Sequence, residues 1–449
     1  MLLKSGRIGF VWLASPGRAA LDRARRIAED SKKYIQKREG IELFSAEDPV
    51  MTLDDASRAV SLLKRSEVDA LVIQHGTYAP AHLSPELVRD FNVPVAVWGI
   101  PEVPLDPSPL NCGSMMGLLG HAAALTSMGR RFRFVYGLPD SEEARRDLDR
   151  FVKAIIVRRG MRQAKVAVIG CPAPFDELAI KDILGSSICH VPIGDVARQL
   201  NSLQKGEIDA DLSDLTSQGC VLDVQDAEAV RRCCAAHAAI RKIVAANDCS
   251  ALAAQCSVEL ADGREIGICT VSSRLTNDGI PASCEGDVDG ALTMLIQNLY
   301  TGRPPFFADW VQRDEKNNQV LFGHCGSAPL SLANPRSEPK VAESNGGKDN
   351  VIFDFPLKTG DVTLARLQRS RGRYKIFVVQ GRAVETAATM KGNYVNVRFE
   401  VPVRTLLDTL LKHGFPQHFS IVYEDIGNEI IEFAEQAGIE AVSPALKET

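Results

Sequence analysis

The sequence predicts an α/β protein with two parallel-sheet α/β domains, followed by a C-terminal antiparallel, β-rich domain with a barrel-like sheet. Two observations indicate the parallel sheets: short apolar strands alternate with helical segments from the first residues, and the pattern starts afresh at KVAVIG, residues 165–170. A third observation indicates the last domain. From Val351 onward apolar residues recur at every second position, as in VIFDF and YKIFVVQG, which is the period of an antiparallel strand with one buried face.

The first domain is expected to span residues 1–163. Its predicted strands are at 7–14, 42–44, 69–74 and 94–98, and its predicted helices are at 19–38, from Thr52 or Asp54, and at 111–130. Short β-branched runs between helices are typical of a parallel sheet that is covered on both faces. Ligands of such sheets meet the loops at the carboxyl ends of the strands, where His75-Gly76-Thr77 and Gly99-Ile100-Pro101-Glu102 lie.

The second domain is expected to span residues 164–280 and the third residues 281–449. The predicted elements of the second are strands at 165–170, near 190–192 and at 251–255, and a helix at 227–246. In the third, the polar stretch 334–350 predicts a loop or insertion, and alternating strands begin at Val351. A strand at 419–423 and a helix at 426–437 close the chain.

Composition excludes several classes of protein. The chain has 449 residues, 45% of them hydrophobic and 24% charged, with a net charge of −5, which is typical of a globular protein. Because basic residues are scattered among acidic ones, nucleic acid is not an expected partner. No run of about 18 apolar residues predicts a membrane span, and the start does not resemble a signal peptide. A cytoplasmic location is expected.

Motif patterns exclude further classes. The sequence has 11 cysteines, an odd number, without the paired CxxC motifs of a zinc ribbon, and the chain is too long for a disulfide scaffold. It has no GxGxxG after the strands at 7–14 or 165–170, no GxxxxGK[ST] and no GxSxG. These absences argue against a dinucleotide site, a phosphate-binding loop and the nucleophile elbow of a hydrolase.

Acidic residues gather around the predicted start of a helix. Glu285 and Asp287 flank a glycine in SCEGD, directly after an apolar strand. Asp287 is expected either to cap the helix or to bind a ligand, because carboxylate oxygens are preferred by hard divalent cations. Upstream, Glu259 follows another apolar strand in CSVEL. The region therefore predicts a candidate metal site.

Two histidines lie at the edges of predicted strands. His324 ends the apolar run VLFGH, and His418 precedes the strand at 419–423. A histidine beside apolar residues is either a structural residue with satisfied hydrogen bonds or a metal ligand. Their positions in a chain with only eight histidines favour ligands for this pair. A structural role is the first interpretation for His75 and His121.

Several segments resemble the L-fucose isomerase family, including its shorter relatives, and more distantly the L-arabinose isomerases. The segments are residues 110–137 (LNCGSMMGLLGHAAALTSMGRRFRFVYG), 280–295 (IPASCEGDVDGALTML), 301–309 (TGRPPFFAD) and 321–330 (LFGHCGSAPL). The resemblance runs over roughly residues 7–330, and residues 417–442 are similar to the end of the arabinose isomerases. It implies two α/β domains, a β-rich C-terminal domain and an aldose–ketose isomerase.

The resemblance also implies a divalent cation, usually Mn²⁺, held by carboxylates and histidines. Asp287 matches the acidic ligand of the helix-opening motif, and His418 and His324 match histidine ligands. Glu259 is similar to the second acidic residue of the short relatives, with Glu285 as the alternative. Both acidic ligands, Glu259 and Asp287, would also carry the proton between adjacent carbons of an enediol intermediate.

The family further implies a homo-oligomer, trimeric or hexameric, in which a neighbouring subunit completes the site. Arg18, Trp98 and Asn111 are candidate substrate-binding residues, although a solvent-exposed arginine, a core tryptophan and a helix cap are equally compatible with the sequence. The substrate is expected to be a pentose, a 6-deoxyhexose or a hexose modified at C6. A non-catalytic sugar-binding protein and an epimerase on the same scaffold are the alternative functions.

Overall fold

The computed structural model describes residues 5–15, 21–102, 113–170, 173–261, 263–344, 350–370, 372–387 and 390–444. The chain forms two compact units, an N-terminal unit of residues 3–160 and a C-terminal unit of residues 161–449 together with residues 1–2. The C-terminal unit includes both of the later sheets. Among the described residues, no helix combines the length and apolar character needed to cross a membrane.

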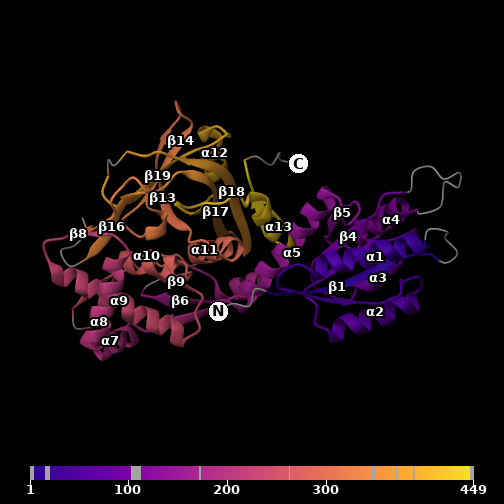
Figure 1. Ribbon diagram of the computed structural model, residues 1–449, viewed down its shortest axis with the longest axis horizontal. Helices are drawn as coiled ribbons and strands as arrows, with labels where there is room; N and C mark the ends of the chain where they lie inside the picture. The colour runs from indigo at the N-terminus through magenta and orange to yellow at the C-terminus, as the bar shows by residue number, and fades with distance from the viewer. Residues whose placement is uncertain are drawn as a thin grey trace. The chain divides into compact units, whose positions relative to one another are not determined.

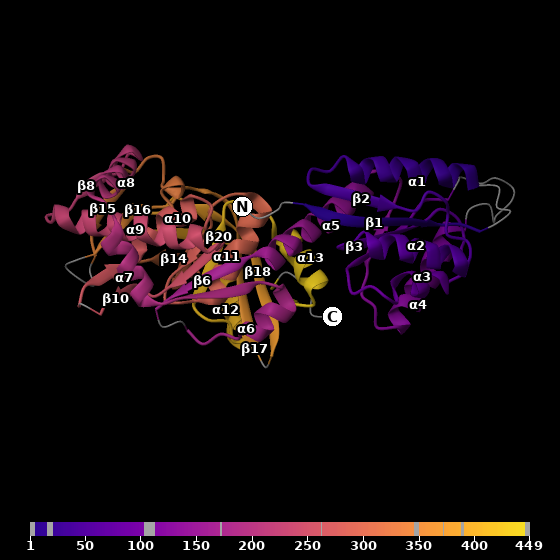
Figure 2. The ribbon, with the colours of Figure 1, turned by 90° about the horizontal axis from the view of Figure 1, so that it is seen from below.

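The N-terminal unit is built on a parallel sheet of order β2-β1-β3-β4-β5. Its strands are β1 (Gly6–Leu13), β2 (Ile41–Ser45), β3 (Ala70–His75), β4 (Val95–Gly99) and β5 (Arg133–Tyr136). Its helices are α1 (Leu21–Gln36), α2 (Leu53–Arg65), α3 (Leu83–Val88), α4 (Ser114–Ser127) and α5 (Glu142–Gln163). Alternate residues of β1 pack against α1 and α5 on one face and α2, α3 and α4 on the other, an arrangement that Figure 2 shows from below.

A second parallel sheet, of order β12-β9-β6-β7, opens the C-terminal unit. Its strands are β6 (Lys165–Ile169), β7 (Ser187–Val191), β9 (Ala251–Ala254) and β12 (Ala282–Ser283). The helices of this region are α6 (Glu177–Ala179), a π-helical turn (Ile180–Leu184), α7 (Ile193–Ser202), α8 (Lys205–Ser217), α9 (Ala227–Ala246) and α10 (Cys269–Asn277). Between β9 and α10, the short antiparallel strands β10 (Ser257–Glu259) and β11 (Glu265–Gly267) form a separate ribbon.

The rest of the chain forms a large sheet that closes into a barrel, as expected. In the order β18-β17-β20-β13-β14-β19, an additional pairing of β19 with β18 closes the ring. These strands are β13 (Phe306–Asp314), β14 (Gln319–His324), β17 (Gly360–Ser370), β18 (Arg373–Val384), β19 (Asn393–Arg398) and β20 (His418–Val422). The extra strands are β8 (Val221–Asp223), β15 (Lys340–Glu343), β16 (Val351–Pro356) and β21 (Glu440–Val442). Aromatic and β-branched side chains of the ring strands fill one core.

Two features of this sheet differ from the sequence-based expectation. The polar stretch 334–350 contains β15, in which the adjacent apolar residues Val341 and Ala342 lie between Lys340 and Glu343 and pair with β16 on one side and β8 on the other. Since β8 comes from the stretch between the strands of the parallel sheet, the chain crosses between the two sheets before residue 280. A short 3₁₀ turn (Leu330–Leu332) precedes β15.

Helix α11 (Val288–Thr301) connects the two sheets of the C-terminal unit. It contacts β6, β9 and β12 of the parallel sheet and β17, β20 and β13 of the barrel, and Figure 1 shows it between them. Its nearly continuous burial explains why its sequence, VDGALTMLIQNLYT, is apolar on more than one face. The remaining helices are α12 (Val403–His413) and α13 (Gly427–Ala437). The start of α11 therefore lies where the parallel sheet meets the barrel.

Candidate metal centre

A tight turn between β12 and α11 presents Glu285. Glu285 and Gly286 both have left-handed backbone conformations, with φ of 58° and 66°. Gly286 N–H donates to Ala254 O at 3.0 Å, and Ser283 Oγ donates to Asp287 O at 2.6 Å. A left-handed conformation at a residue with a side chain costs free energy and persists where the surroundings fix it. Here it holds a carboxylate that is 48% exposed beside the barrel strands.

Three neighbouring barrel strands supply the other polar side chains. β13 lies between β20 and β14, and Asp309 is paired with His418 on one side and with Gly323 on the other. His418 is the first residue of β20, and His324 is the last residue of β14. Since directly paired residues of antiparallel strands project on the same face of the sheet, Asp309 and His418 face each other, with Asp309 Oδ1 3.3 Å from His418 Nε2.

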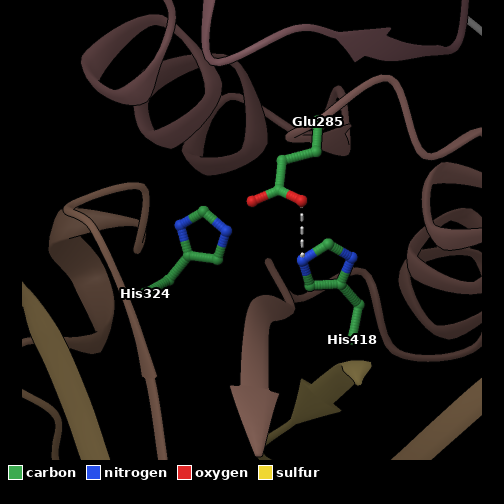
Figure 3. A group of neighbouring side chains, drawn as sticks. All are labelled: Glu285, His324 and His418. Carbon is green, nitrogen blue, oxygen red and sulfur yellow. Dashed lines mark ion pairs between the residues drawn. The ribbon is translucent and has the colours of Figure 1, made fainter. Parts of the chain in front are cut away.

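Glu285, His324 and His418 converge on one point (Figure 3). One potential ligand atom of each lies within 4.8 Å of the others, and Glu285 Oε2 is 3.7 Å from His418 Nε2. No other such group is found among the described residues. With Asp309 alongside, the candidate metal centre offers two carboxylates and two imidazoles, a mixed oxygen and nitrogen donor set that suits a divalent transition metal such as Mn²⁺.

Asp287 orients one of the imidazoles. His418 Nδ1 lies 3.2 Å from Asp287 Oδ2, so a proton on Nδ1 is shared with the carboxylate and Nε2 is left to face Glu285 and Asp309. A carboxylate behind a histidine is common at metal sites, where it fixes the tautomer and makes the ligand nitrogen more basic. In the geometry shown, Asp287 acts on the candidate metal centre through His418.

The carboxylate of Asp287 is also committed to two other partners. Asp287 Oδ1 accepts the Gly290 N–H at 2.7 Å, capping α11, and Oδ2 is 2.5 Å from Arg366 Nη1 on β17. Burial by itself would raise the pKa of Asp287, but the charge of Arg366 and the hydrogen bonds from His418, Arg366 and Gly290 hold that pKa well below its usual range. Asp287 therefore caps α11 and at the same time contacts His418 and Arg366.

His324 is buried and held by a single hydroxyl. Ser327 Oγ is 3.2 Å from its Nδ1, and burial, followed by the neighbouring His418, lowers the pKa of His324 to about 4. The imidazole is therefore neutral near pH 7, as a ligand must be. The Nε2 atoms of His324 and His418 are both buried and form no hydrogen bond among the described residues. Because such atoms are costly unless satisfied, a cation bound between them is the fitting partner.

Phe307 forms the apolar wall of the centre. Its ring lies 4.6 Å from the His418 ring and 5.9 Å from the His324 ring, measured between centroids. Gly290 makes this position possible, since a Cβ there would lie 2.5 Å from Phe307 Cε2. Burial raises the pKa of the nearby Asp309, with Glu285 adding to the effect and His418 opposing it.

The structure places the other predicted residues elsewhere. Glu259 is exposed at the end of β10, opposite Glu265 in the ribbon, and is not in the group that can hold a metal. Trp98 is fully buried in β4, where its indole N–H donates to Gly137 O at 2.8 Å, so it is a core residue of the N-terminal unit. Arg18 and Asn111 lie outside the described residues.

Asp309 is the member of the centre that sequence reasoning missed. It ends the FFAD segment that was used only for the family resemblance. Two features of the sequence could have indicated Asp309. It is an acid in an otherwise apolar run, and it lies two positions after Phe307, which places both side chains on one face of a strand. Nothing in the sequence shows that this strand pairs with the one that begins at His418.

Comparison with known proteins agrees with this architecture. Residues 19–162 match the N-terminal domain of the fucose/sulfoquinovose isomerase family, and residues 323–443 match the L-fucose isomerase C-terminal domain. A sulfoquinovose isomerase from Priestia aryabhattai is 26% identical, with 89% of this chain and 90% of the relative covered. One from Alkalicoccus urumqiensis is 27% identical, covering 82% and 84%.

More distant matches follow. The L-arabinose isomerase 1 of Bacillus licheniformis is 23% identical, with 69% of this chain and 66% of the relative covered. Among solved structures, a glucose-galactose binding protein from Geobacillus stearothermophilus matches at a TM-score of 0.17, with 12% identity and coverage of 67% of this chain and 92% of that chain. The two domain matches together span more than half of the chain. The protein belongs to the L-fucose isomerase family and is a sugar isomerase.

Proposed function

We propose that this chain is an aldose–ketose isomerase that depends on a divalent cation, Mn²⁺ in the first place, and acts through an enediol intermediate. One observation carries the proposal: two buried imidazole nitrogens, which form no hydrogen bond within the described part of the chain, face a shared point beside two carboxylates. A cation there would supply Lewis-acid polarisation of the carbonyl and hydroxyl oxygens on adjacent sugar carbons. His324, His418, Glu285 and Asp309 would hold it.

The carboxylates of the centre have the positions that proton transfer requires. Isomerisation removes a proton from C2 of the aldose and returns one to C1, so a base must lie beside both carbons. Glu285, whose side chain is 48% exposed, and Asp309, at 35%, reach outward from the buried histidines. Asp287 is not suited to this role because its carboxylate is buried and paired with Arg366. We assign the proton transfer to Glu285 and the closing of the ligand shell to Asp309.

We propose a hexose carrying an anionic substituent at C6 as substrate, with sulfoquinovose as the first candidate. The support is the likeness to several sulfoquinovose isomerases over more than four-fifths of this chain, against a shorter and weaker likeness to an arabinose isomerase. A trimeric or hexameric assembly stays a prediction from the family resemblance, and a cytoplasmic location stays a prediction from the sequence pattern.

The test is a substrate screen in D₂O. The protein is stripped with a chelator, reloaded with Mn²⁺ and offered sulfoquinovose, glucose 6-phosphate, glucose, L-fucose and L-arabinose. The expected result is a ketose from sulfoquinovose, with solvent deuterium at C1 of the ketose and at C2 of recovered aldose. A product epimeric at C2 without ketose would refute the reaction. Turnover of L-fucose or L-arabinose alone would refute the substrate, and absence of Mn²⁺ binding would refute the centre.

Two variants assign the carboxylates. Glu285→Gln should retain Mn²⁺ with weakened affinity and lose deuterium exchange, by roughly 10²–10⁴-fold if general base catalysis is removed. Asp309→Asn should weaken Mn²⁺ binding and retain exchange once the cation is saturating. The matched control is Glu259→Gln, an exposed glutamate outside the group, which should change neither quantity. The reverse pattern, with exchange lost only in Asp309→Asn, would transfer the base role to Asp309.

A further inference from the structure

Three thiols gather directly behind Glu285. Cys256 Sγ and Cys284 Sγ are 3.4 Å apart, and Cys269 lies near both. The fold explains the closeness of the first pair. β9 and β12 are paired parallel strands, and Cys256 and Cys284 follow their last residues by two and one positions. Neighbouring strands lie about 4.8 Å apart, so side chains just beyond their ends meet.

The two thiols of the pair differ in access to solvent. Cys256 is exposed, whereas Cys284 is 1% exposed. A small oxidant in solution therefore meets Cys256 first, with the second thiol already in place behind it. Isomerisation moves only protons and requires no sulfur nucleophile, so the pair has no part in the reaction proposed above.

The pair is mechanically connected to Glu285. Cys284 immediately precedes it in the turn between β12 and α11. A disulfide S–S bond is about 2.05 Å long, so joining the two sulfurs requires them to approach by roughly 1.3 Å. Glu285 lies in a left-handed conformation with φ of 58°, and the adjacent Cys284 is buried among close-packed atoms that leave it little room to move alone. Movement of Cys284 therefore displaces the adjacent carboxylate from His324 and His418.

We propose that Cys256 and Cys284 are an oxidation site at which a hydroperoxide forms a reversible disulfide that switches the neighbouring centre off. The Cys256 sulfur attacks a peroxide oxygen, the O–O bond breaks, and Cys256 sulfenic acid and water (or an alcohol) form. The Cys284 sulfur then attacks the sulfenic sulfur, the S–O bond breaks, and a second water leaves with both thiol protons accounted for. The two thiols lose two electrons, which reduce the peroxide. A dithiol reverses the step.

The chemical test does not require turnover. The Mn²⁺-loaded protein is treated with hydrogen peroxide, then alkylated, digested and analysed by mass spectrometry. A cross-link between the peptides of Cys256 and Cys284, reversed by dithiothreitol, is expected. Cys256→Ser should abolish it. Cys284→Ala is the second variant, and its folding is checked by circular dichroism. Absence of the cross-link in the unsubstituted protein overturns the proposal, whether or not the protein is an isomerase.

The switch is tested separately, and its activity readout rests on the proposed function. Oxidation should lower turnover and weaken Mn²⁺ binding by at least about 10-fold, as expected when a ligand shell is disturbed, and both should return with dithiothreitol. Cys256→Ser should keep both under peroxide. The matched control is Cys189→Ser, which removes a thiol near Cys249, at the opposite end of β9, and it should respond like the unsubstituted protein. A cross-link that leaves Mn²⁺ affinity unchanged overturns the switch while the isomerase proposal stands.

Discussion

Each unit of the molecule contains a pair of neighbouring buried histidines, and among the described residues only the pair of the C-terminal unit belongs to a candidate metal centre. In the C-terminal unit the rings of His324 and His418 lie 6.0 Å apart, and in the N-terminal unit those of His75 and His121 lie 4.5 Å apart. Burial is the largest cause lowering the pKa of His324 and of His121, each to about 4. His75 forms no hydrogen bond among the described residues through either ring nitrogen.

The difference lies in the carboxylates. His121 contacts Ser84 Oγ through one ring nitrogen and Ala79 O through the other, so the pair in the N-terminal unit meets only neutral groups in these contacts. His418 faces Glu285 and Asp309, and Asp287 fixes it from behind. Buried imidazoles alone therefore do not define a cation site. Nearby carboxylates are also needed, because their negative charge offsets the charge of the cation. The predictions below test this comparison.

The largest effect is expected from His418→Ala. Loss of this ligand should weaken Mn²⁺ binding by more than roughly 100-fold, since replacing even the residues behind metal ligands costs 10–100-fold, and turnover should fall with it. His75→Ala should leave Mn²⁺ affinity unchanged, because His75 does not belong to the group of side chains that could hold a metal ion. Isothermal titration with Mn²⁺ measures both. Equal weakening by His75→Ala would break the comparison.

The pair of Asp287 with Arg366 should dominate the stability of the centre. Asp287→Asn can still cap α11, but it leaves Arg366 charged, buried and without its ion-pair partner. The expected cost is about 3–5 kcal/mol of unfolding free energy. Combining it with Arg366→Met should restore much of that stability while Mn²⁺ affinity stays reduced, because His418 has still lost its orienting carboxylate. Urea unfolding and Mn²⁺ titration of the single and double variants separate the loss of stability from the loss of Mn²⁺ affinity. Recovery of Mn²⁺ affinity in the double variant would show that Asp287 does not act through His418.

Acid should weaken both units through their histidines. The folded pKa of about 4 for His324 and for His121 lies below the 6.5 of an unfolded chain. Between these values only the unfolded state binds the proton, so stability is full above pH 6.5 and falls as pH decreases toward 4, by up to roughly 3 kcal/mol for each group. Urea unfolding of His324→Asn and His121→Asn from pH 7 to 4.5 should show a reduced pH slope in each. In the unsubstituted protein, added Mn²⁺ should make the unfolding free energy depend more steeply on pH. In His324→Asn, Mn²⁺ should have a much smaller effect on this pH dependence.

The smallest effect is expected from Gly290→Ala. The new Cβ would meet Phe307 at 2.5 Å, and overpacking of this kind costs about 1–3 kcal/mol. Because Phe307 lies against His418, turnover should fall as well. The control is Gly302→Ala, at the end of the same helix, where no heavy atom lies near the added Cβ but φ is 65°; it should cost stability without changing Mn²⁺ affinity. A change in affinity for the control alone would refute the role of Phe307.

The sequence predicted most of the fold because its periods are local properties. The alternation of apolar and polar residues after Val351 is a property of each strand alone. The burial of β1 on both faces of its sheet follows from its uninterrupted apolar run. The path of β8 into the barrel sheet could not be predicted, since a pairing between residues 221–223 and 340–342 depends on the tertiary structure.

The same reasoning explains what was found and missed at the centre. Glu285, Asp287, His324 and His418 stand out because polar residues interrupt apolar runs at strand or helix ends. The residue type gave no way to separate Asp287, which acts through His418, from Asp309, which faces the centre directly. That distinction depends on the register of β13 with β20 and on Arg366, a residue from a third strand.

The separation of these residues along the chain has a consequence for biosynthesis. Asp287 and His418 are 131 positions apart, and β20 lies between β17 and β13 in the barrel. Contacts of such separation form late, because a long loop must close before they stabilise anything. A nascent chain therefore cannot assemble the full ligand set until its last strands leave the ribosome and the barrel closes. Capture of the proposed cation would then be a final checkpoint that distinguishes finished molecules from truncated ones.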